Sequence, residues 1–456
     1  MKNTNINRYK TYFRIIINIL LIVILSYQYY NVWVDVYNDF LRFSYLRKGN
    51  YFMALIYALI LTLFQTIYGG SKIGEYRLNN IIFSETLALV ITNVIVYVAI
   101  IVPAAALGFI NPLAILYTTM YQIIVIVIWA ILVDYIMKKI FPPSKMLLIY
   151  GNLYKDKLME KFIKRKDIYT IEESICIDED EEKIKQKCNI YDNIIIGDIK
   201  SEKRNELLKY CFIKSKIAFV LPKLSDIILN KSENYYLFDS PLYISRNEGI
   251  PLEMTIVKRI MDILVSIIII LLLSPILILI SICIKLEDGG PILFVQERIT
   301  KNNKKFNIIK FRSMKVSNDY KVRPTEQSDE RITKVGRIIR LTHMDELPQF
   351  FNVIKGDMSI VGPRPERREH VELYSKEISE FSYRLKVKAG ITGLAQIYGK
   401  YNTEAYDKLK FDLIYIQNYS FIMDLEIVLK TIKVLFIKEK TEGFEKEKSK
   451  EIQKNA

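Results

Sequence analysis

Four long apolar stretches open the sequence, and short polar or charged segments separate them. Each has close to the roughly 20 residues that a helix needs to cross about 30 Å of hydrocarbon. We therefore expect residues 1–140 to form a bundle of four transmembrane helices. The stretches cover about Tyr12–Val34, Tyr51–Tyr68, Ile82–Pro103 and Pro112–Met137.

The basic residues between these stretches predict an orientation. Lys72 and Arg77 lie between the second and third stretches, and Lys138 and Lys139 follow the fourth, whereas the loop after the third has no Lys or Arg. Because basic loops tend to stay in the cytoplasm, both ends of the bundle are expected there. The basic loop at residues 42–48 weakens this pattern.

Residues 145–245 have the pattern of a small α/β domain. Short apolar runs at Met146–Tyr150, Asn193–Ile196 and Ile217–Leu221 alternate with charged stretches of helical character. This alternation predicts a Rossmann-like fold with a parallel sheet. No G-x-G-x-x-G motif follows Gly151, so we expect the domain to lack a cofactor. A role as a ligand sensor for the rest of the chain stays open.

A fifth apolar run, Ile263–Ile284, is interrupted at its middle by Ser274 and Pro275. Proline removes a backbone donor and clashes with the preceding turn, so a helix must kink or break there. We expect residues 252–286 to form a helix-break-helix.

Basic residues flank both ends of this run, with Lys258 and Arg259 before it and Lys285 after it. Since both ends then favour the cytoplasm, the pattern predicts a re-entrant hairpin that enters one leaflet and returns. A kinked spanning helix is the alternative. Asp262, where the hairpin would enter the membrane, is expected to face protein or to pair with a cation such as Arg259.

Composition supports a membrane protein with anionic ligands. The 456 residues are 51% hydrophobic and carry a formal charge of +15. Long apolar segments make a nucleic-acid partner improbable and favour anionic lipids or phosphorylated ligands. With two histidines and four scattered cysteines, a zinc site is not expected.

The candidate chemistry lies in residues 287–437, which read as a mixed α/β catalytic domain. Adjacent carboxylates, Asp345 and Glu346, precede Pro348. A helix starting at Asp345 and stopping at Gly356 would place Asp345 at the positive end of the helix dipole, ionised as a nucleophile or metal ligand. Glu346 would point about 100° away, in a different role. A solvated helix cap is the alternative.

Basic residues near these carboxylates suit phosphate. Arg364 lies between two prolines, which restrict its backbone, and arginine binds phosphate bidentately. Lys310 and Arg312 end a strand-like run and, on one face, could reach the same anion. Arg340 precedes Asp345 by five residues. Carboxylates among phosphate-binding cations indicate phosphoryl transfer.

These elements resemble the bacterial sugar transferase domain of the monotopic phosphoglycosyl transferases. The whole chain is similar to the long-form polyprenyl glycosylphosphotransferases that begin exopolysaccharide or capsule repeat units. The matching elements, in the family's order, are Lys258–Asp262, Ser274-Pro275, Gly290-Pro291, Phe294, Gln296, Arg298, Lys310–Met314, Arg331–Thr333, Asp345–Gln349, Gly356–Ser359, Gly362–Glu366 and Gly390–Gly393.

The resemblance implies a function at the cytoplasmic face of the bacterial cell membrane. Asp345 would attack the β-phosphate of a UDP-sugar, releasing UMP, and undecaprenyl phosphate would then take the sugar phosphate from the aspartate. Mg²⁺ would be required, held by Asp345 and Glu346. Lys310, Arg312, Arg340 and Arg364 would bind substrate phosphate.

Small departures from the family pattern leave the charged groups intact. Ala389 stands where the family usually has proline, Thr300 where it has glycine, and Met344 where it has leucine. A catalytically silent scaffold for polysaccharide assembly is the alternative function. The sequence leaves open the sugar, a homodimer and contacts with other assembly proteins. Residues 438–456 are expected to be a polar, disordered tail.

Overall fold

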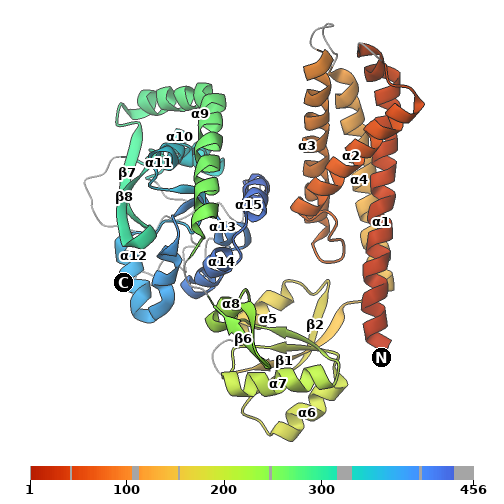
Figure 1. Ribbon diagram of the computed structural model, residues 1–456, viewed down its shortest axis with the longest axis vertical. Coiled ribbons are helices and arrows are strands. Elements are labelled where there is room, and N and C mark those ends of the chain that lie inside the picture. The colour runs from red at the N-terminus through yellow and green to blue at the C-terminus, as the bar shows by residue number, and fades with distance from the viewer. Residues whose placement is uncertain are drawn as a thin grey trace. The chain divides into compact units, whose positions relative to one another are not determined.

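The computed structural model describes residues 2–41, 44–104, 112–151, 155–245, 249–315, 331–399 and 403–435 (Figure 1). Its contacts divide the chain into two compact units, Met1–Leu221 and Pro222–Ala456. The expected tail at 438–456 lies outside the described residues.

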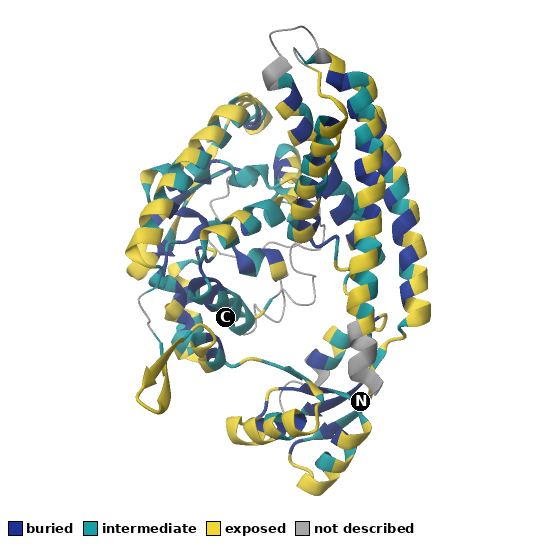
Figure 2. Cartoon of the chain, turned by 45° about the vertical axis from the view of Figure 1, so that its right-hand side comes forward, coloured by how far each residue is buried: buried dark blue, intermediate teal, exposed yellow. Residues whose placement is uncertain are grey.

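The first unit begins with four long apolar helices. They are α1 (Lys2–Val32), which continues through the π-helix η1 (Trp33–Tyr37) and the 3₁₀ helix η2 (Asn38–Phe40), then α2 (Arg47–Tyr68), α3 (Leu78–Ala104) and α4 (Leu113–Ile140). By length and composition, all four could cross a membrane. Each packs against two of the others, with exposed positions on their outer faces (Figure 2).

Polar side chains in the interior between these helices form hydrogen bonds with one another. The Tyr57 hydroxyl donates to Asn93 Oδ1 over 2.9 Å, and Asn93 Nδ2 donates to Gln122 Oε1 over 2.9 Å. Gln122 Nε2 in turn donates to the Leu25 carbonyl over 3.0 Å, which joins α1 to α4. Because polar groups in an apolar interior need partners, these bonds fix how the helices face one another.

A parallel sheet completes the first unit and confirms the expected α/β domain. Its strands are β1 (Ser144–Tyr150), β2 (Tyr169–Cys176), β3 (Asn193–Ile196) and β4 (Ile217–Val220), in the order β2-β1-β3-β4. The connecting helices are α5 (Lys155–Ile163), α6 (Glu181–Ile190) and α7 (Ser201–Ile213). The edge strand β2, which Glu172 and Glu173 interrupt, was not predicted from the sequence.

The second unit begins earlier than the domain boundary expected at residue 245. Its first elements are α8 (Leu224–Leu229) and a hairpin of β5 (Glu233–Leu237) and β6 (Ser240–Ile244). Leu224 and Ile227 belong to the core of the second unit, and α8 packs on α14 (Ala405–Gln417). The apolar face of α8 therefore joins the later part of the chain.

Helix α9 (Leu252–Asp288) follows, with Pro275 inside it. Its 37 residues would measure about 55 Å if straight. Instead it turns sharply between two arms (Figure 1), and both ends bond to the same unit. Arg259 near its start donates to the Val353 carbonyl over 2.5 Å, and Glu287 near its end accepts from the Lys334 amide over 2.6 Å.

Mixed α/β structure makes up the rest of the second unit. Two small sheets are formed by the antiparallel pair β7 (Leu293–Thr300) and β8 (Lys304–Phe311), joined by η3 (Lys301–Asn303), and by the parallel pair β9 (Ser359–Val361) and β10 (Gly390–Thr392). The remaining elements are α10 (Lys334–Leu341), η4 (Met344–Glu346), α11 (Gln349–Lys355), α12 (Arg368–Glu377), η5 (Ser379–Lys386), α13 (Leu394–Tyr398) and α15 (Phe421–Val434).

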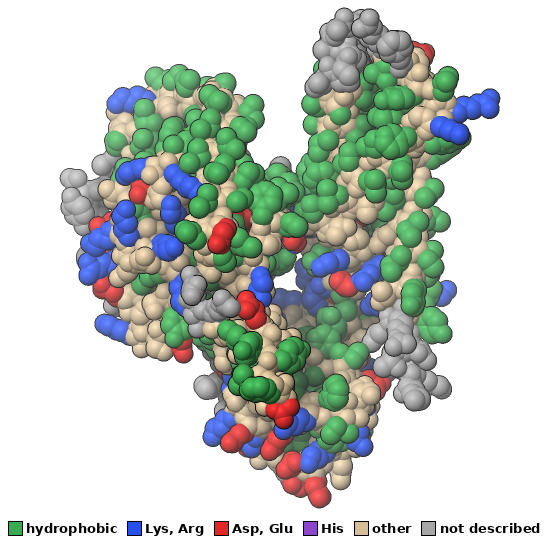
Figure 3. All heavy atoms as spheres, viewed as in Figure 1, with side chains coloured by type: hydrophobic (Ala, Val, Ile, Leu, Met, Phe, Trp, Pro, Cys, Tyr) green, Lys and Arg blue, Asp and Glu red, His purple; other side chains and the backbone are tan. Residues whose placement is uncertain are grey.

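Hydrophobic side chains gather on the visible surface over α9 and over the long helices of the first unit (Figure 3). In α9 the exposed fractions of Leu271 and Leu272 are 67% and 72%. Such contiguous apolar surface is costly in water and indicates a lipid or protein environment. α9 is the fifth helix long and apolar enough to cross a membrane.

Close backbone contacts between β9 and β10 require glycine. A Cβ atom on Gly390 would lie 2.1 Å from the Gly362 amide nitrogen, and one on Gly393 would lie 2.3 Å from the Gly362 carbonyl oxygen. These contacts hold the start of the loop that carries Arg364 directly against β10. No side chain fits between the two strands there.

We expect Gly390→Ala to destabilise the second unit by about 1–3 kcal/mol, because the methyl group must push backbone atoms apart. Thermal unfolding of the detergent-solubilised chain measures this. The control is Gly289→Asn, where a Cβ meets nothing within 4 Å and only the strain of the φ of +69° remains, which is smaller for asparagine than for most residues. An equal loss of stability in both variants would contradict the backbone contact as the cause.

Candidate functional site

The two adjacent carboxylates lie in a tight turn between α10 and α11. His343 has a φ of +55°, which reverses the chain after α10, and Asp345 and Glu346 follow in η4. Helix α11 starts at Gln349 with Pro348 as its N-cap, so the helix expected from Asp345 starts four residues later than predicted. It ends at Gly356, as predicted, with a φ of +98°.

Glu346 is held by two cations from different elements. Lys310 at the end of β8 places Nζ 2.6 Å from Glu346 Oε1, and Arg364 places Nη2 2.8 Å from the same oxygen. Burial opposes ionisation, but Arg364 and Lys310 together keep the pKa of Glu346 well below its usual range. Glu346 is therefore a fixed anion whose position is set by both cations.

Asp345 has the opposite electrostatic environment. Burial and the neighbouring charge of Glu346 raise its pKa to about 6, against the opposing influence of Lys310, Arg340 and Arg364. Desolvation, rather than the helix dipole that the sequence suggested, dominates its electrostatics. Two neighbouring carboxylates whose pKa values are pushed apart are typical of a division of roles.

The structure brings three of the four expected phosphate-binding residues to this pair. Lys310 and Arg364 bond Glu346, and the charges of Lys310, Arg340 and Arg364 all act on Asp345. Both prolines beside Arg364 are buried, whereas its side chain is 47% exposed. The loop is therefore anchored by its prolines and presents the guanidinium outward.

Arg312 lies apart from these cations. Its guanidinium forms an ion pair with Asp288, at the end of α9, and its Nε donates to the Pro291 carbonyl over 2.6 Å. The β8 ladder ends at Phe311, so the alternation that would have placed Arg312 on the face of Lys310 no longer applies. In this structure Arg312 secures the connection between α9 and β7.

The residues at the start of α9 anchor it to the rest of the unit. Lys258 forms an ion pair of 2.5 Å with Asp424, and Arg259 donates to carbonyls at the end of α11. Asp262 faces protein, as expected, but it accepts from the Ile360 amide over 3.0 Å rather than pairing with Arg259. The helix stays continuous past Pro275, where a break was expected, and there the Ser274 hydroxyl donates to the Leu271 carbonyl over 2.8 Å.

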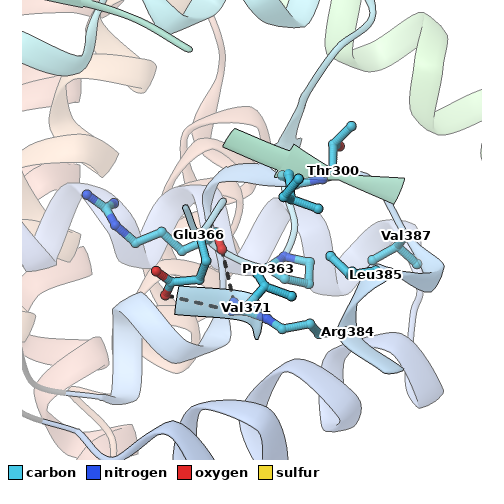
Figure 4. Close-up of a pocket in the computed structure, with 10 residues that line it drawn as sticks. Thr300, Pro363, Glu366, Val371, Arg384, Leu385 and Val387 are labelled. Carbon is cyan, nitrogen blue, oxygen red and sulfur yellow. Dashed lines mark hydrogen bonds and ion pairs between the residues drawn. The ribbon is translucent and has the colours of Figure 1, made fainter. Parts of the chain in front are cut away.

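A buried charged group behind the Arg364 loop was missed by sequence reasoning. Arg384 and Asp412 are each 2% exposed and form an ion pair of 2.8 Å, and Arg384 also lies 3.7 Å from Glu366. Arg384 and Glu366 border a small pocket that includes Thr300, Pro363 and Val387 (Figure 4). Asp412 stands between Phe411 and Leu413 in an apolar helix, a signal that could have marked it.

Among the described residues, no cluster of three or more His, Cys, Asp or Glu side chains could hold a metal ion. Asp345 and Glu346 alone offer two oxygen ligands. Mg²⁺ commonly binds through one or two carboxylates, with water and substrate phosphates completing its shell. The pair therefore fits Mg²⁺ bound together with a phosphorylated substrate.

Comparison with known proteins assigns the sequence to a family. A sequence profile described as bacterial sugar transferase matches residues 253–438. A UDP-glucose:undecaprenyl-phosphate glucose-1-phosphate transferase of Caulobacter vibrioides is 37% identical over 234 residues, which are 49% of this chain and 85% of that protein. The chain belongs to the bacterial sugar transferase family. The resemblance inferred from the motifs is thus confirmed.

Two longer members of the family match over a smaller share of their length. A UDP-N-acetylgalactosamine-undecaprenyl-phosphate N-acetylgalactosaminephosphotransferase of Aeromonas hydrophila is 42% identical over 211 residues, 45% of this chain and 47% of that protein. A UDP-glucose:undecaprenyl-phosphate glucose-1-phosphate transferase of Klebsiella pneumoniae is 45% identical over 207 residues, 44% of this chain and 43% of that protein. The chain thus matches less than half the length of each.

The environment of Glu366 predicts how stability changes with pH. Burial alone would raise its pKa, but His370 and the cations Arg384, Lys408 and Arg298 lower it to about 2 from 4.5. A lowered folded-state pKa adds stability that is complete above about pH 4.5 and is lost as the pH falls toward 2.

We therefore expect Glu366→Gln to destabilise the second unit by about 2–3 kcal/mol at pH 7. The difference from the unaltered chain should shrink steadily as the pH falls from about 4.5 toward 2, because Glu366 takes up a proton in the unfolded chain before it does so in the folded one. Unfolding midpoints across this range measure it. The exposed Glu369→Gln is the matched control. If Glu366→Gln loses the same amount of stability at every pH, the ionised carboxylate of Glu366 is not the cause of the loss.

Proposed function

We propose that the chain transfers a sugar 1-phosphate from a UDP-sugar to undecaprenyl phosphate, giving undecaprenyl-diphosphate-sugar and UMP. This would be the initiating step of exopolysaccharide, capsule or O-antigen repeat-unit synthesis. The observation that carries the proposal is the turn at Asp345 and Glu346, surrounded by Lys310, Arg340 and Arg364. The activities for which the relatives are named supply the substrate class.

In the first step, a carboxylate oxygen of Asp345 attacks the β-phosphorus of the UDP-sugar. The bond between that phosphorus and the bridging oxygen breaks, UMP leaves with the electron pair, and a sugar-phosphoryl-aspartate remains. Arg364, Lys310 and Arg340 lie where they can offset charge on the transferring phosphoryl group. Because Glu346 is pinned by two cations, Asp345 is the better candidate nucleophile.

In the second step, a phosphate oxygen of undecaprenyl phosphate attacks the same phosphorus and frees the Asp345 carboxylate. A soluble donor and a lipid acceptor would thus use one site in turn, which predicts ping-pong kinetics. Mg²⁺, when bound by Asp345 and Glu346 with the substrate, supplies further neutralisation of phosphate charge.

We also propose that α9 is a re-entrant membrane helix and that the second unit lies on the cytoplasmic face. The support is that Arg259 and Glu287, near opposite ends of α9, bond to α11 and α10 of one unit, while the apolar middle is exposed. A spanning helix would separate its ends by the thickness of the bilayer. The hydrophobic first-unit helices would add further anchoring in the same membrane.

Asp345→Asn should abolish both UMP release and the labelling of protein by a UDP-sugar that carries ³²P in its β-phosphate. Asparagine keeps the shape of the side chain but is a very poor nucleophile, so the expected loss is about 10³-fold or more. Quenched reactions analysed by mass spectrometry would locate the adduct in the unaltered chain.

The matched control is Asp407→Asn, the same substitution in the first turn of α14. It should retain the label and the turnover. Full activity of Asp345→Asn, or an adduct on another side chain, would refute Asp345 as the nucleophile. Kinetics that require both substrates to be bound together would refute the two-step transfer.

The sugar itself is tested by a panel of UDP-sugars. The relatives named above act on UDP-glucose or UDP-N-acetylgalactosamine, so both belong in the panel. We expect UMP release with at least one member, dependent on undecaprenyl phosphate for continued turnover. If no UDP-sugar in the panel leads to UMP release, the result would instead favour a non-catalytic scaffold for polysaccharide assembly.

A further inference from the structure

The loop that carries Arg364 is held by an unbroken series of hydrogen bonds to its carbonyl groups. The Pro363 carbonyl accepts from the Gly390 amide over 2.9 Å, and the Glu366 carbonyl accepts from the Ile299 amide over 3.1 Å. Between them, the Arg364 and Pro365 carbonyls accept from two guanidinium groups, over 3.0 and 3.3 Å. Four consecutive carbonyls are thus fixed by donors from three other segments.

Arg384 supplies the bond to the carbonyl of Arg364 itself. Its Nη2 donates to that oxygen and lies 2.8 Å from Asp412 Oδ2, while Nη1 lies 3.7 Å from Glu366 Oε1. The close-up in Figure 4 shows Arg384 directed toward Glu366. One guanidinium therefore connects the loop backbone, a loop side chain and helix α14.

Arg384 is placed too deep to touch a ligand at the carboxylate pair. It is 2% exposed, whereas Arg364 on the loop that it holds is 47% exposed and reaches Glu346. A cation in such an interior is strongly destabilised unless an anion accompanies it, and Asp412, also 2% exposed, is that anion. The Arg384 guanidinium further packs over the Phe381 ring at 5.0 Å.

We propose that Arg384 is a positioning residue, which aims Arg364 at the carboxylate pair by holding its backbone carbonyl. Asp412 keeps Arg384 charged and oriented inside the unit. The inference rests on the proposed function for its kinetic consequence, but the restraint on the loop is a property of the fold.

Arginine suits this task better than lysine. The planar fork of a guanidinium can address two acceptors in fixed directions, whereas an ammonium group is a point charge on a flexible stem. A lysine in place of Arg384 would keep the charge beside Asp412 but could not also hold the Arg364 carbonyl in a set direction. Arg384→Lys therefore separates the positioning role from the burial of a cation.

The kinetic test is a double-mutant cycle between Arg384→Lys and Arg364→Ala, measured as kcat/KM for UMP release. Alone, Arg384→Lys should lower kcat/KM by about tenfold to a hundredfold, since misplacing a substrate-facing group by about 1 Å has effects of that size. In the Arg364→Ala background its further effect should stay within about twofold, because the side chain that it aims is gone.

The structural test is hydrogen–deuterium exchange of the full chain. Arg384→Lys should speed exchange in residues 359–370 and leave α15 unchanged. Arg312→Lys, the same substitution at another buried, ion-paired arginine, should leave residues 359–370 unchanged. If Arg384→Lys does not fold, Asp412→Asn replaces it, with the same expected pattern.

Two results would overturn the proposal. One is that Arg384→Lys lowers kcat/KM equally in the unaltered chain and in the Arg364→Ala background, which would indicate a general structural role. The other is exchange that is unchanged in residues 359–370 or faster throughout the unit. If the unaltered chain releases no UMP from any UDP-sugar, the proposed function fails, and the exchange data alone decide the positioning role.

Discussion

The ion pairs of Glu346 with Lys310 and Arg364 are the interaction on which the site depends. They join the end of β8, the turn before α11 and the loop after β9, three segments that lie well apart along the sequence. A largely buried carboxylate is stable as an anion only if cations are held beside it. Since Glu346 is fixed as the anion, the raised pKa falls on Asp345, and the two carboxylates are free to take different roles.

The residues behind the carboxylate pair are likewise held by charge and by close packing. Arg364 can pair with Glu346 because hydrogen bonds to successive carbonyls fix its loop. The loop can lie against β10 because Gly390 and Gly393 allow the two backbones to touch. Arg384 and Asp412 then neutralise each other in the interior. These ion pairs and close backbone contacts thus restrict the motion of the Arg364 loop, and the loop in turn positions Arg364 beside Glu346.

Local patterns in the sequence revealed much of this arrangement. The sequence was enough to predict the apolar stretches, three of the four parallel strands and the residues flanking Asp345. Each of these features depends on only a few neighbouring residues. The edge strand β2 could not, since its half-exposed pattern is broken by charges. The partner of Arg312 was also unreadable, because the end of the β8 ladder at Phe311 depends on pairing with β7. Long-range partners such as Arg384 and Asp412 are set only by the tertiary fold.

If α9 is the re-entrant helix proposed above, its anchoring at both ends has a consequence in membranes of different thickness. A helix that crosses a bilayer must tilt or stretch its surroundings when its length and the hydrocarbon width disagree. Here Arg259 and Glu287 tie the helix to α11 and α10, on either side of the turn that carries Asp345, so a re-entrant α9 would enter only as deep as its own bend allows. In the proposed arrangement, the height of the Asp345 carboxylate above the lipid headgroups would then be a fixed dimension of the protein, insensitive to the far leaflet.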